Sequence, residues 1–169
     1  MTSPKDIAIR SVFVTQALGT MGVDPAWDAG LTAYLTCHAR MVAQEEFGKS
    51  WYLNQNMNQI GLVKFGAAYL KERHDDSELN AARASYEAEQ ERINEAYYEP
   101  LWDASRKLAL IPAPTIAAAI FKVMLIDLEE LGNDSAMTVD CAEVVERDFA
   151  RLMATPEKSR SVPGRRAAA

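Results

Sequence analysis

Residues 108–126 read LALIPAPTIAAAIFKVMLI, a stretch of nineteen residues in which Lys122 is the only charge. A helix needs about twenty apolar residues to span a bilayer, but Pro112 and Pro114 interrupt this run. Because proline cannot continue the hydrogen-bond ladder of a helix, the second helix can begin only near Pro114. Only residues 116–126 remain for an uninterrupted apolar helix, so the stretch predicts a core helix and not a membrane span.

The apolar side chains of this helix cover most of its circumference, which indicates a helix that other elements surround. They are Ile116, Ile120, Phe121, Val123, Met124, Leu125 and Leu128. We therefore expect this helix to lie at the centre of a bundle and to end at Gly132. We also expect Ile120→Asp to unfold the domain. Lys122 is expected to run its stem along apolar neighbours and keep its amine in water.

The rest of the chain predicts further helices, bounded by capping residues, prolines and glycines. Their expected ranges are 4–18, 25–48, 51–73, 77–108 and 135–153. The third is expected to break or fray near an amide-rich middle and Gly61, and the fourth to kink at Pro100. No segment alternates with period two for long enough to predict a strand. The sequence thus predicts an all-α, single-domain bundle of five to six helices over residues 1–154.

The charged residues are distributed unevenly along the chain. The net charge is −6, yet residues 155–169 carry +3, which leaves −9 on residues 1–154. An acidic body does not attract phosphate backbones, so we expect no direct nucleic-acid binding by the body. Residues 155–169 lack apolar periodicity and are expected to form a disordered basic tail.

Cysteine usage and the N-terminus favour a cytoplasmic setting. Cys37 and Cys141 form neither a CxxC pair nor a disulfide framework. The opening residues, MTSPKDIAIR, lack the long apolar run of a signal peptide. We therefore expect a cytoplasmic protein that is not attached to a membrane.

Motifs for catalysis, cofactors and metals are missing from the sequence. Neither His38 nor His74 follows a Glu by three residues, as a di-iron bundle requires. There is no GxSxG, GxGxxG, Walker loop or HExxH. The run ERHDDSE, residues 72–78, holds possible metal ligands, but its residue types are also those that cap helices. We assign no catalytic residue, no cofactor and no metal site.

Acidic residues recur at steps of four along the predicted helix 77–108. They are Glu87, Glu91, Glu95, Glu99 and Asp103. Each step drifts by about 40° in an α-helix, so the row winds round it. It is interpreted either as a solvated surface or as a ridge for a basic partner, with the tail as the nearest basic candidate.

Aromatic residues exceed what one small core needs, and aromatics are enriched at interfaces. We take Trp51, Tyr98 and Trp102 as candidate partner-binding residues. The amide run NQNMNQ, residues 54–59, is interpreted as a solvated helix face with local side-chain bonding, although amides also bind peptide backbones.

Trp102 leads into Pro112, Ala113, Thr115 and Lys122, which fit a PA-x-T-x6-K element. This arrangement resembles that of small uncharacterised helical proteins of alphaproteobacteria and their phages, although Ala118 stands where their pattern has Gly. The resemblance implies a bacterial or mobile-element origin, and it implies no activity.

Three function classes follow from these observations. The favoured one is a non-enzymatic helical protein-interaction module that binds itself or another protein, with a homo-oligomer expected. The second is an acidic inhibitor or regulator that occupies the basic, nucleic-acid-binding site of another protein. The third is an enzyme of unrecognised type.

Overall fold

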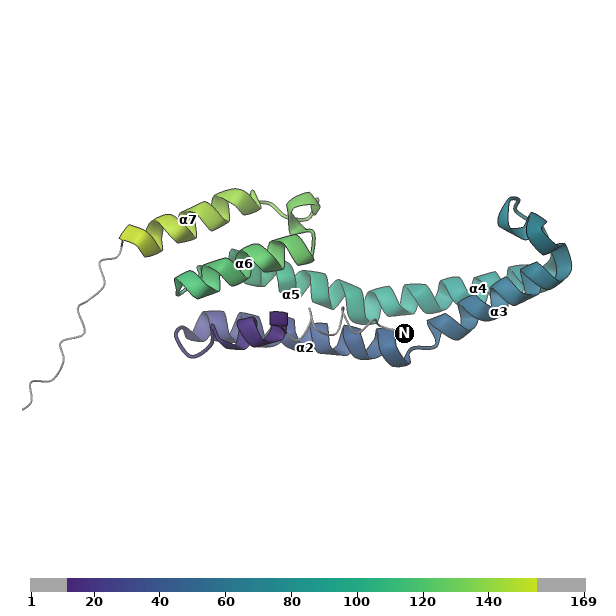
Figure 1. Ribbon diagram of the computed structural model, residues 1–169, viewed down its shortest axis with the longest axis horizontal. Coiled ribbons are helices and arrows are strands. Elements are labelled where there is room, and N and C mark those ends of the chain that lie inside the picture. The colour runs from purple at the N-terminus through teal and green to yellow at the C-terminus, as the bar shows by residue number, and fades with distance from the viewer. Residues whose placement is uncertain (1–11, 155–169) are drawn as a thin grey trace, which may run out of the picture.

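The computed structural model describes residues 12–154, which form helices joined by turns and, within that range, contain no strand. The predicted all-α bundle is confirmed (Figure 1). Residues 12–18 are helical, and after them come α2 (Pro25–Phe47), α3 (Ser50–Phe65), η1 (Gly66–Leu70), α4 (Ser77–Ile93), η2 (Asn94–Tyr98), α5 (Glu99–Leu110), α6 (Ile116–Leu128), η3 (Leu131–Asn133) and α7 (Cys141–Ala154). The predictions for residues 1–11 and for the tail 155–169 lie outside the described residues.

The chain has a body and an arm (Figure 1). Residues 12–18, α2, α5, α6 and α7 form the body, in which α2 packs along α5 and α6 packs between α5 and α7. Helices α3 and α4 run antiparallel to one another and extend away from the body as a two-helix arm.

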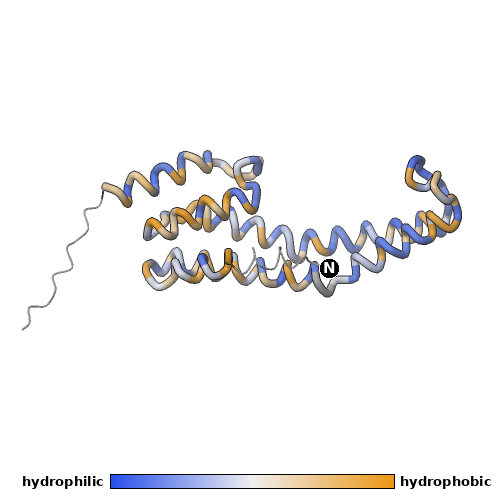
Figure 2. The backbone as a smooth tube through the Cα atoms, viewed as in Figure 1, coloured by the Kyte–Doolittle hydropathy of each residue, from blue (hydrophilic) through white to orange (hydrophobic). Residues whose placement is uncertain are grey.

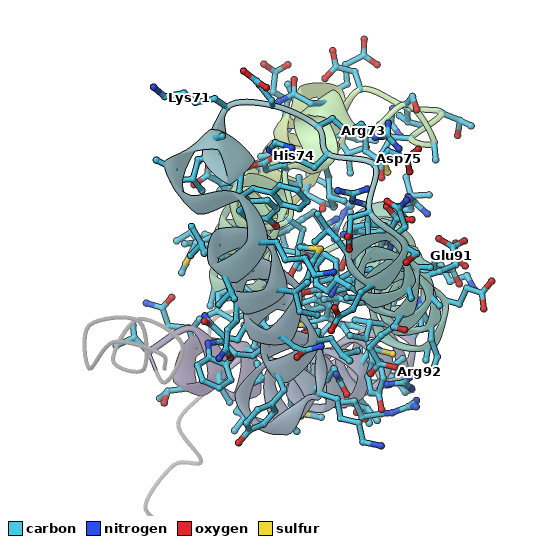
Figure 3. All side chains as sticks on the ribbon, turned by 90° about the vertical axis from the view of Figure 1, so that its right-hand side faces the viewer. Lys71, Arg73, His74, Asp75, Glu91 and Arg92 are labelled. Atoms are coloured by element: carbon cyan, nitrogen blue, oxygen red, sulfur yellow. The ribbon has the colours of Figure 1, made fainter. Side chains whose placement is uncertain are left out.

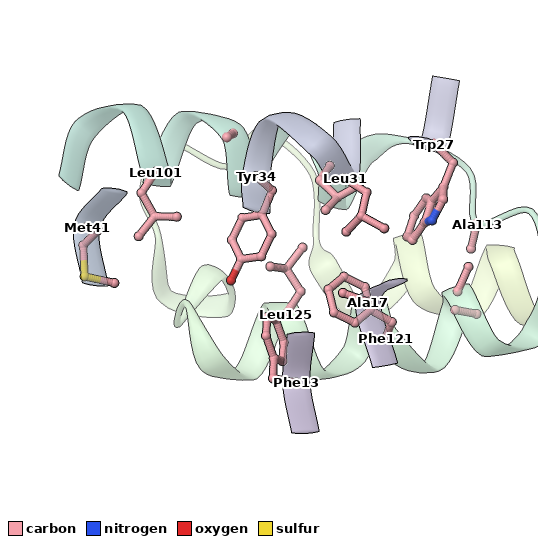
Figure 4. Close-up of a cluster of buried hydrophobic side chains, with 14 residues drawn as sticks. Phe13, Ala17, Trp27, Leu31, Tyr34, Met41, Leu101, Ala113, Phe121 and Leu125 are labelled. Carbon is pink, nitrogen blue, oxygen red and sulfur yellow. The ribbon is translucent and has the colours of Figure 1, made fainter. Parts of the chain in front are cut away.

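The core of the body forms where the apolar faces of its helices meet (Figure 4). Trp27, Leu31 and Tyr34 from α2 pack against Phe121 and Leu125 from α6, and all five side chains are buried. The spacing of the three α2 residues places them on one helical face. This core joins helix 12–18, α2, α5 and α6 into one unit.

Helix α6 is the most apolar element of the body (Figure 2). Thr115 caps its N-terminus by accepting a hydrogen bond from the amide of Ala118 at 3.1 Å. Its inner face is buried, but Ile120 is 51% exposed and Ile116 and Val123 are also exposed. The expectation that Ile120 lies in a buried centre is therefore wrong, because no neighbour in residues 12–154 covers this face.

Lys122 also departs from the sequence prediction, because its side chain is completely buried. Its ammonium group pairs with Asp148 of α7 and donates to the carbonyl of Ile111 at 2.6 Å. Asp148 also accepts from the amide of Ala113 at 3.1 Å. A buried charge needs such partners, and these contacts fix the proline-containing turn before α6 onto α7.

The predicted long kinked helix is confirmed as α4, η2 and α5 in succession. η2 is a single π-helical turn, in which the amide of Glu99 donates to the carbonyl of Asn94, five residues earlier. Pro100 follows at the start of α5. Proline has no N–H and its ring clashes with the carbonyl four residues before it, so a widened turn at this position accommodates it.

The predicted break near Gly61 is wrong, because α3 runs through it without interruption. A Cβ at position 61 would lie 2.3 Å from the ring of Tyr69, so Gly61 permits that ring to fold back on α3. The helix ends instead at Gly66, whose φ of 56° is in the region that favours glycine. The turn η1 follows directly.

The last helix begins at Cys141, six residues after its predicted start at 135. Asp134 and Asp140 each accept a backbone amide hydrogen bond two residues on, so two polar turns follow one another before the helix starts. The predicted end of α6 at Gly132 is also wrong, because Glu130 takes the left-handed conformation with a φ of 52°.

Candidate protein interaction surface

Helix α3 contributes almost nothing to the core of the described chain. Gly61 is its only buried residue among residues 50–65. Neither cluster of buried hydrophobic side chains in the described chain includes a residue of α3 or α4. Because the stability of helices in proteins comes mostly from tertiary packing of an apolar face, α3 is supported only along the side that faces α4.

The outer side of α3 carries a continuous row of exposed side chains without a charge, which we call the α3 stripe. Its members are Trp51, Tyr52, Gln55, Asn56, Gln59, Leu62 and Val63. Tyr52 is 69% exposed and Val63 is 78% exposed, and they lie three helical turns apart. The stripe begins with two aromatic residues, has amides in its middle and ends with two aliphatic residues.

The amide run of residues 54–59 divides between two sides of α3. On the inner side, Asn58 donates to Asn54 at 3.1 Å and accepts from the hydroxyl of Tyr69 at 3.0 Å. On the outer side, Gln55, Asn56 and Gln59 are exposed. The predicted local side-chain bonding therefore describes the inner amides, while the outer ones belong to the α3 stripe.

The one charged residue of α3 points to α4 and not to the stripe. Lys64 forms ion pairs with Asp76 at 2.7 Å and with Glu78 at 2.8 Å, both at the start of α4. Asp76 also caps α4 by accepting from the amides of Glu78 and Leu79. The α3 stripe therefore has no competing charge along its length.

The five residues of the acidic row, Glu87, Glu91, Glu95, Glu99 and Asp103, are all exposed. In an uninterrupted α-helix the row would drift by roughly 160° over its four steps. The π turn η2 inserts one extra residue and takes back about 100° of this drift. The predicted winding is thus largely cancelled, and Glu91 points away from α3 (Figure 3).

The candidate aromatic residues do not gather into one patch. Trp51 contacts Tyr52 on α3 edge-to-face, with ring centroids 4.9 Å apart. Tyr98 and Trp102 form a second pair on η2 and α5, with centroids 5.9 Å apart. The hydroxyl of Tyr98 donates to Glu45 at 3.2 Å, so this hydrogen bond joins η2 to α2.

The turn at the tip of the arm covers residues 71–76 and packs against the end of α3. His74 stacks on Phe65 with ring centroids 4.0 Å apart. A cavity of about 470 Å³ lies beside Arg73, His74, Asp75 and Arg83. Within residues 12–154 no three His, Cys, Asp or Glu side chains come close enough to hold a metal ion.

His38 is buried in the body and packs against aromatic rings. Its ring centroid lies 6.1 Å from that of Phe13 and 5.7 Å from that of Tyr34. It thus belongs to the core of the body.

Sequence reasoning named Trp51 as a candidate and weighed the amide run 54–59, but it did not recognise the α3 stripe as one surface. The signal was present, because α3 holds a single charge in sixteen residues, which is unusual for a helix exposed along one side. This signal was ambiguous, because a helix with few charges and scattered apolar residues is also typical of a half-buried position.

In the part of the chain that the structure describes, no helix has both the length and the apolar character needed to cross a membrane. Comparisons with family models, with curated proteins and with solved structures give no match for this chain.

Proposed function

We propose that the chain is a non-enzymatic helical protein-interaction module, in which the body is a scaffold and the arm presents the α3 stripe to another protein chain. The observation that carries this proposal is that, within residues 12–154, α3 adds no side chain to either core cluster and no other element covers its outer side. A partner on that side would supply the packing that α3 lacks.

The composition of the stripe supports an interface. Tyrosine and tryptophan are enriched at the centres of protein–protein contacts, and charged residues are depleted there. Trp51 and Tyr52 supply two such rings, and the stripe contains no carboxylate or ammonium group. Binding would therefore not require the removal of a charge from water.

The experiment compares capture by three forms of the full chain: wild type, Val63→Lys and Val23→Lys. Val63 is in the stripe and Val23 is in a turn of the body, and both are mostly exposed, so the two substitutions place the same charge at different surfaces. The immobilised chain is exposed to free chain and to bacterial lysate. Specific retention that Val63→Lys abolishes and Val23→Lys preserves supports the proposal, whereas equal retention by both variants contradicts it.

The acidic row favours a second candidate, an acidic regulator that occupies the basic, nucleic-acid-binding site of another protein. The specific observation is that all five carboxylates are exposed and that the π turn η2 lies within the row, where its extra residue reduces the helical drift. A ridge of this kind would attract a basic surface by electrostatic steering, and salt would weaken the attraction.

Replacing Glu91 and Glu95 by Gln tests this second candidate. Relief of like-charge repulsion should stabilise the isolated chain by a few tenths of a kcal/mol, while binding to a basic partner should weaken and lose salt dependence. Capture across a salt series that is identical for wild type and the double Gln variant would show that the row is only a solvated surface.

A further inference from the structure

We infer that the partner of the α3 stripe is a second copy of this chain, bound antiparallel so that the two α3 helices pack across a two-fold axis. This inference rests on the proposed function, because it assigns the partner of the same surface. It is drawn from the charge, the hydrogen-bonding groups and the residue order of α3.

The charge of the molecule restricts where two copies can meet. The chain carries a net charge of −6, and the acidic row lies exposed on α4 and α5. Two copies that met through these faces would bring carboxylates together, which is unfavourable. Since the one charged residue of α3, Lys64, is paired with Asp76 and Glu78, the α3 stripe lets two acidic copies approach without juxtaposed charges.

The amides in the middle of the stripe are complementary to themselves. Each of Gln55, Asn56 and Gln59 carries both a donor NH₂ group and an acceptor oxygen. An amide can therefore bond to the same kind of group on an identical chain, which neither a carboxylate nor an ammonium group can do. A two-fold interface is formed by the same patch on both subunits, so it requires this property.

The order of residues along α3 sets the direction of pairing. In an antiparallel pair with its axis between Asn56 and Gln59, Tyr52 of one copy faces Val63 of the other, and Asn56 faces Gln59. Aromatic rings then pack on aliphatic side chains at both ends, with amide groups on amide groups between them. A parallel pair would instead place Tyr52 on Tyr52 at one end and Val63 on Val63 at the other, so the aromatic rings would not contact the aliphatic side chains.

The arm leaves room for this arrangement, because α3 and α4 project from the body (Figure 1). α3 has sixteen residues, so it is about 24 Å long. A single pair of such helices covers less than the roughly 800 Å² per partner of a standard interface. We therefore expect a dimer that dissociates in the micromolar range and not a permanent one.

Sedimentation equilibrium of the full chain tests the inference with the two matched lysine variants and with Ile120→Lys. Wild type, Val23→Lys and Ile120→Lys should dimerise with similar dissociation constants, while Val63→Lys should raise the constant by at least about tenfold. Far-UV circular dichroism shows whether Val63→Lys retains its helices. A monomeric wild type at about 100 μM, dimerisation of Val63→Lys as tight as wild type, or loss of dimerisation in Ile120→Lys overturns the inference.

Disulfide trapping tests the direction of pairing, in a background where Cys37 and Cys141 are replaced by Ala. Chains carrying Tyr52→Cys and chains carrying Val63→Cys are mixed and oxidised. The antiparallel pair predicts cross-linked dimers that contain one chain of each kind, formed only in the mixture. Dimers that form within each separate sample show parallel pairing and overturn the antiparallel register.

The outcomes also separate this inference from the proposed function. The wild-type chain could be monomeric and still capture another protein, with capture abolished by Val63→Lys and preserved by Val23→Lys. This result would overturn the inference that the partner is a second copy, but it would support the proposed interaction module. If the chain is monomeric and Val63→Lys changes no capture, both are overturned.

Discussion

At the scale of single residues, the body is organised around buried polar groups that the sequence pattern did not reveal. Lys122 and Asp148 are twenty-six residues apart and form a buried ion pair. Arg151 donates to the carbonyl of Ala113 and to Asp148, so the turn between α5 and α6 is held by charged groups of α7. Helical periodicity predicts a face but not a partner on a distant helix, and for this reason Lys122 was expected to reach water.

Lys122→Met is expected to lower the free energy of unfolding by about 3 kcal/mol, because it removes the buried cation of Asp148 and leaves this carboxylate only the more distant, half-exposed Arg151. The matched control is Lys107→Met, which removes the exposed ion pair with Asp103 and should cost less than about 1 kcal/mol. Urea denaturation measures both. The double variant Lys122→Met/Asp148→Asn should recover a large part of the loss, and a Lys122→Met chain as stable as the control would contradict a buried pair.

Glu129 gives the body a pH dependence. Burial raises the pKa of its carboxyl above the ordinary 4.5, although the hydrogen bond from Tyr34 at 2.7 Å opposes the shift. The folded chain thus binds this proton more tightly than the unfolded chain, and the free energy of unfolding falls as pH rises from about 4.5 through the raised pKa.

Glu129→Gln removes the charge and keeps an oxygen that can accept from Tyr34. We therefore expect the wild type to lose more stability than Glu129→Gln between about pH 5 and pH 8, as measured by urea denaturation at both values. Parallel pH profiles for the two chains would show that this carboxyl titrates as an ordinary surface group.

At the scale of elements, the helices that carry strong local signals were predicted well. Asp24 with Pro25 placed the start of α2, where the Asp24 carboxylate accepts from the amides of Ala26 and Trp27. The errors arose where two signals competed. Gly61 was interpreted as a break because glycine weakens helices, yet a ring contact from Tyr69 explains its presence.

The drift of the acidic row illustrates a second limit of sequence reasoning. Pro100 predicted a kink, but the means of accommodating it, a π turn over residues 94–98, depends on which carbonyls the proline displaces. The sequence therefore predicted the five acidic residues as candidates, whereas the reduced drift of the row follows from a turn type that has no sequence signature of its own.

Helix α6 provides a matched pair of substitutions. Ile120 is 51% exposed and the adjacent Phe121 is 1% exposed. Ile120→Asp should change the free energy of unfolding by no more than about 1 kcal/mol, whereas Phe121→Asp should cost more than about 4 kcal/mol and unfold much of the population. Thermal melts followed by circular dichroism compare them, and equally severe loss in both would show that the outer face of α6 is covered in solution.

At the scale of the whole molecule, the described chain combines a well-packed body with an arm that has little core of its own. The all-α class followed from composition and periodicity, because neither depends on distant contacts. The division into body and arm could not be predicted in this way. Every helix has some apolar face, and only the three-dimensional arrangement shows which face is covered. Of the α3 stripe, only Trp51 was among the predicted residues, whereas Tyr98, Trp102 and the acidic row lie on other elements.

The most direct test of the central claim, that a second copy of this chain covers the α3 stripe, is hydrogen exchange of the full chain followed by mass spectrometry at two concentrations. About 1 μM and about 100 μM bracket the expected dissociation constant. Amides of residues 50–65 should exchange more slowly at the higher concentration, while those of α6 should be unchanged. Exchange in α3 that is independent of concentration, or protection that increases at α6 instead, would contradict the account.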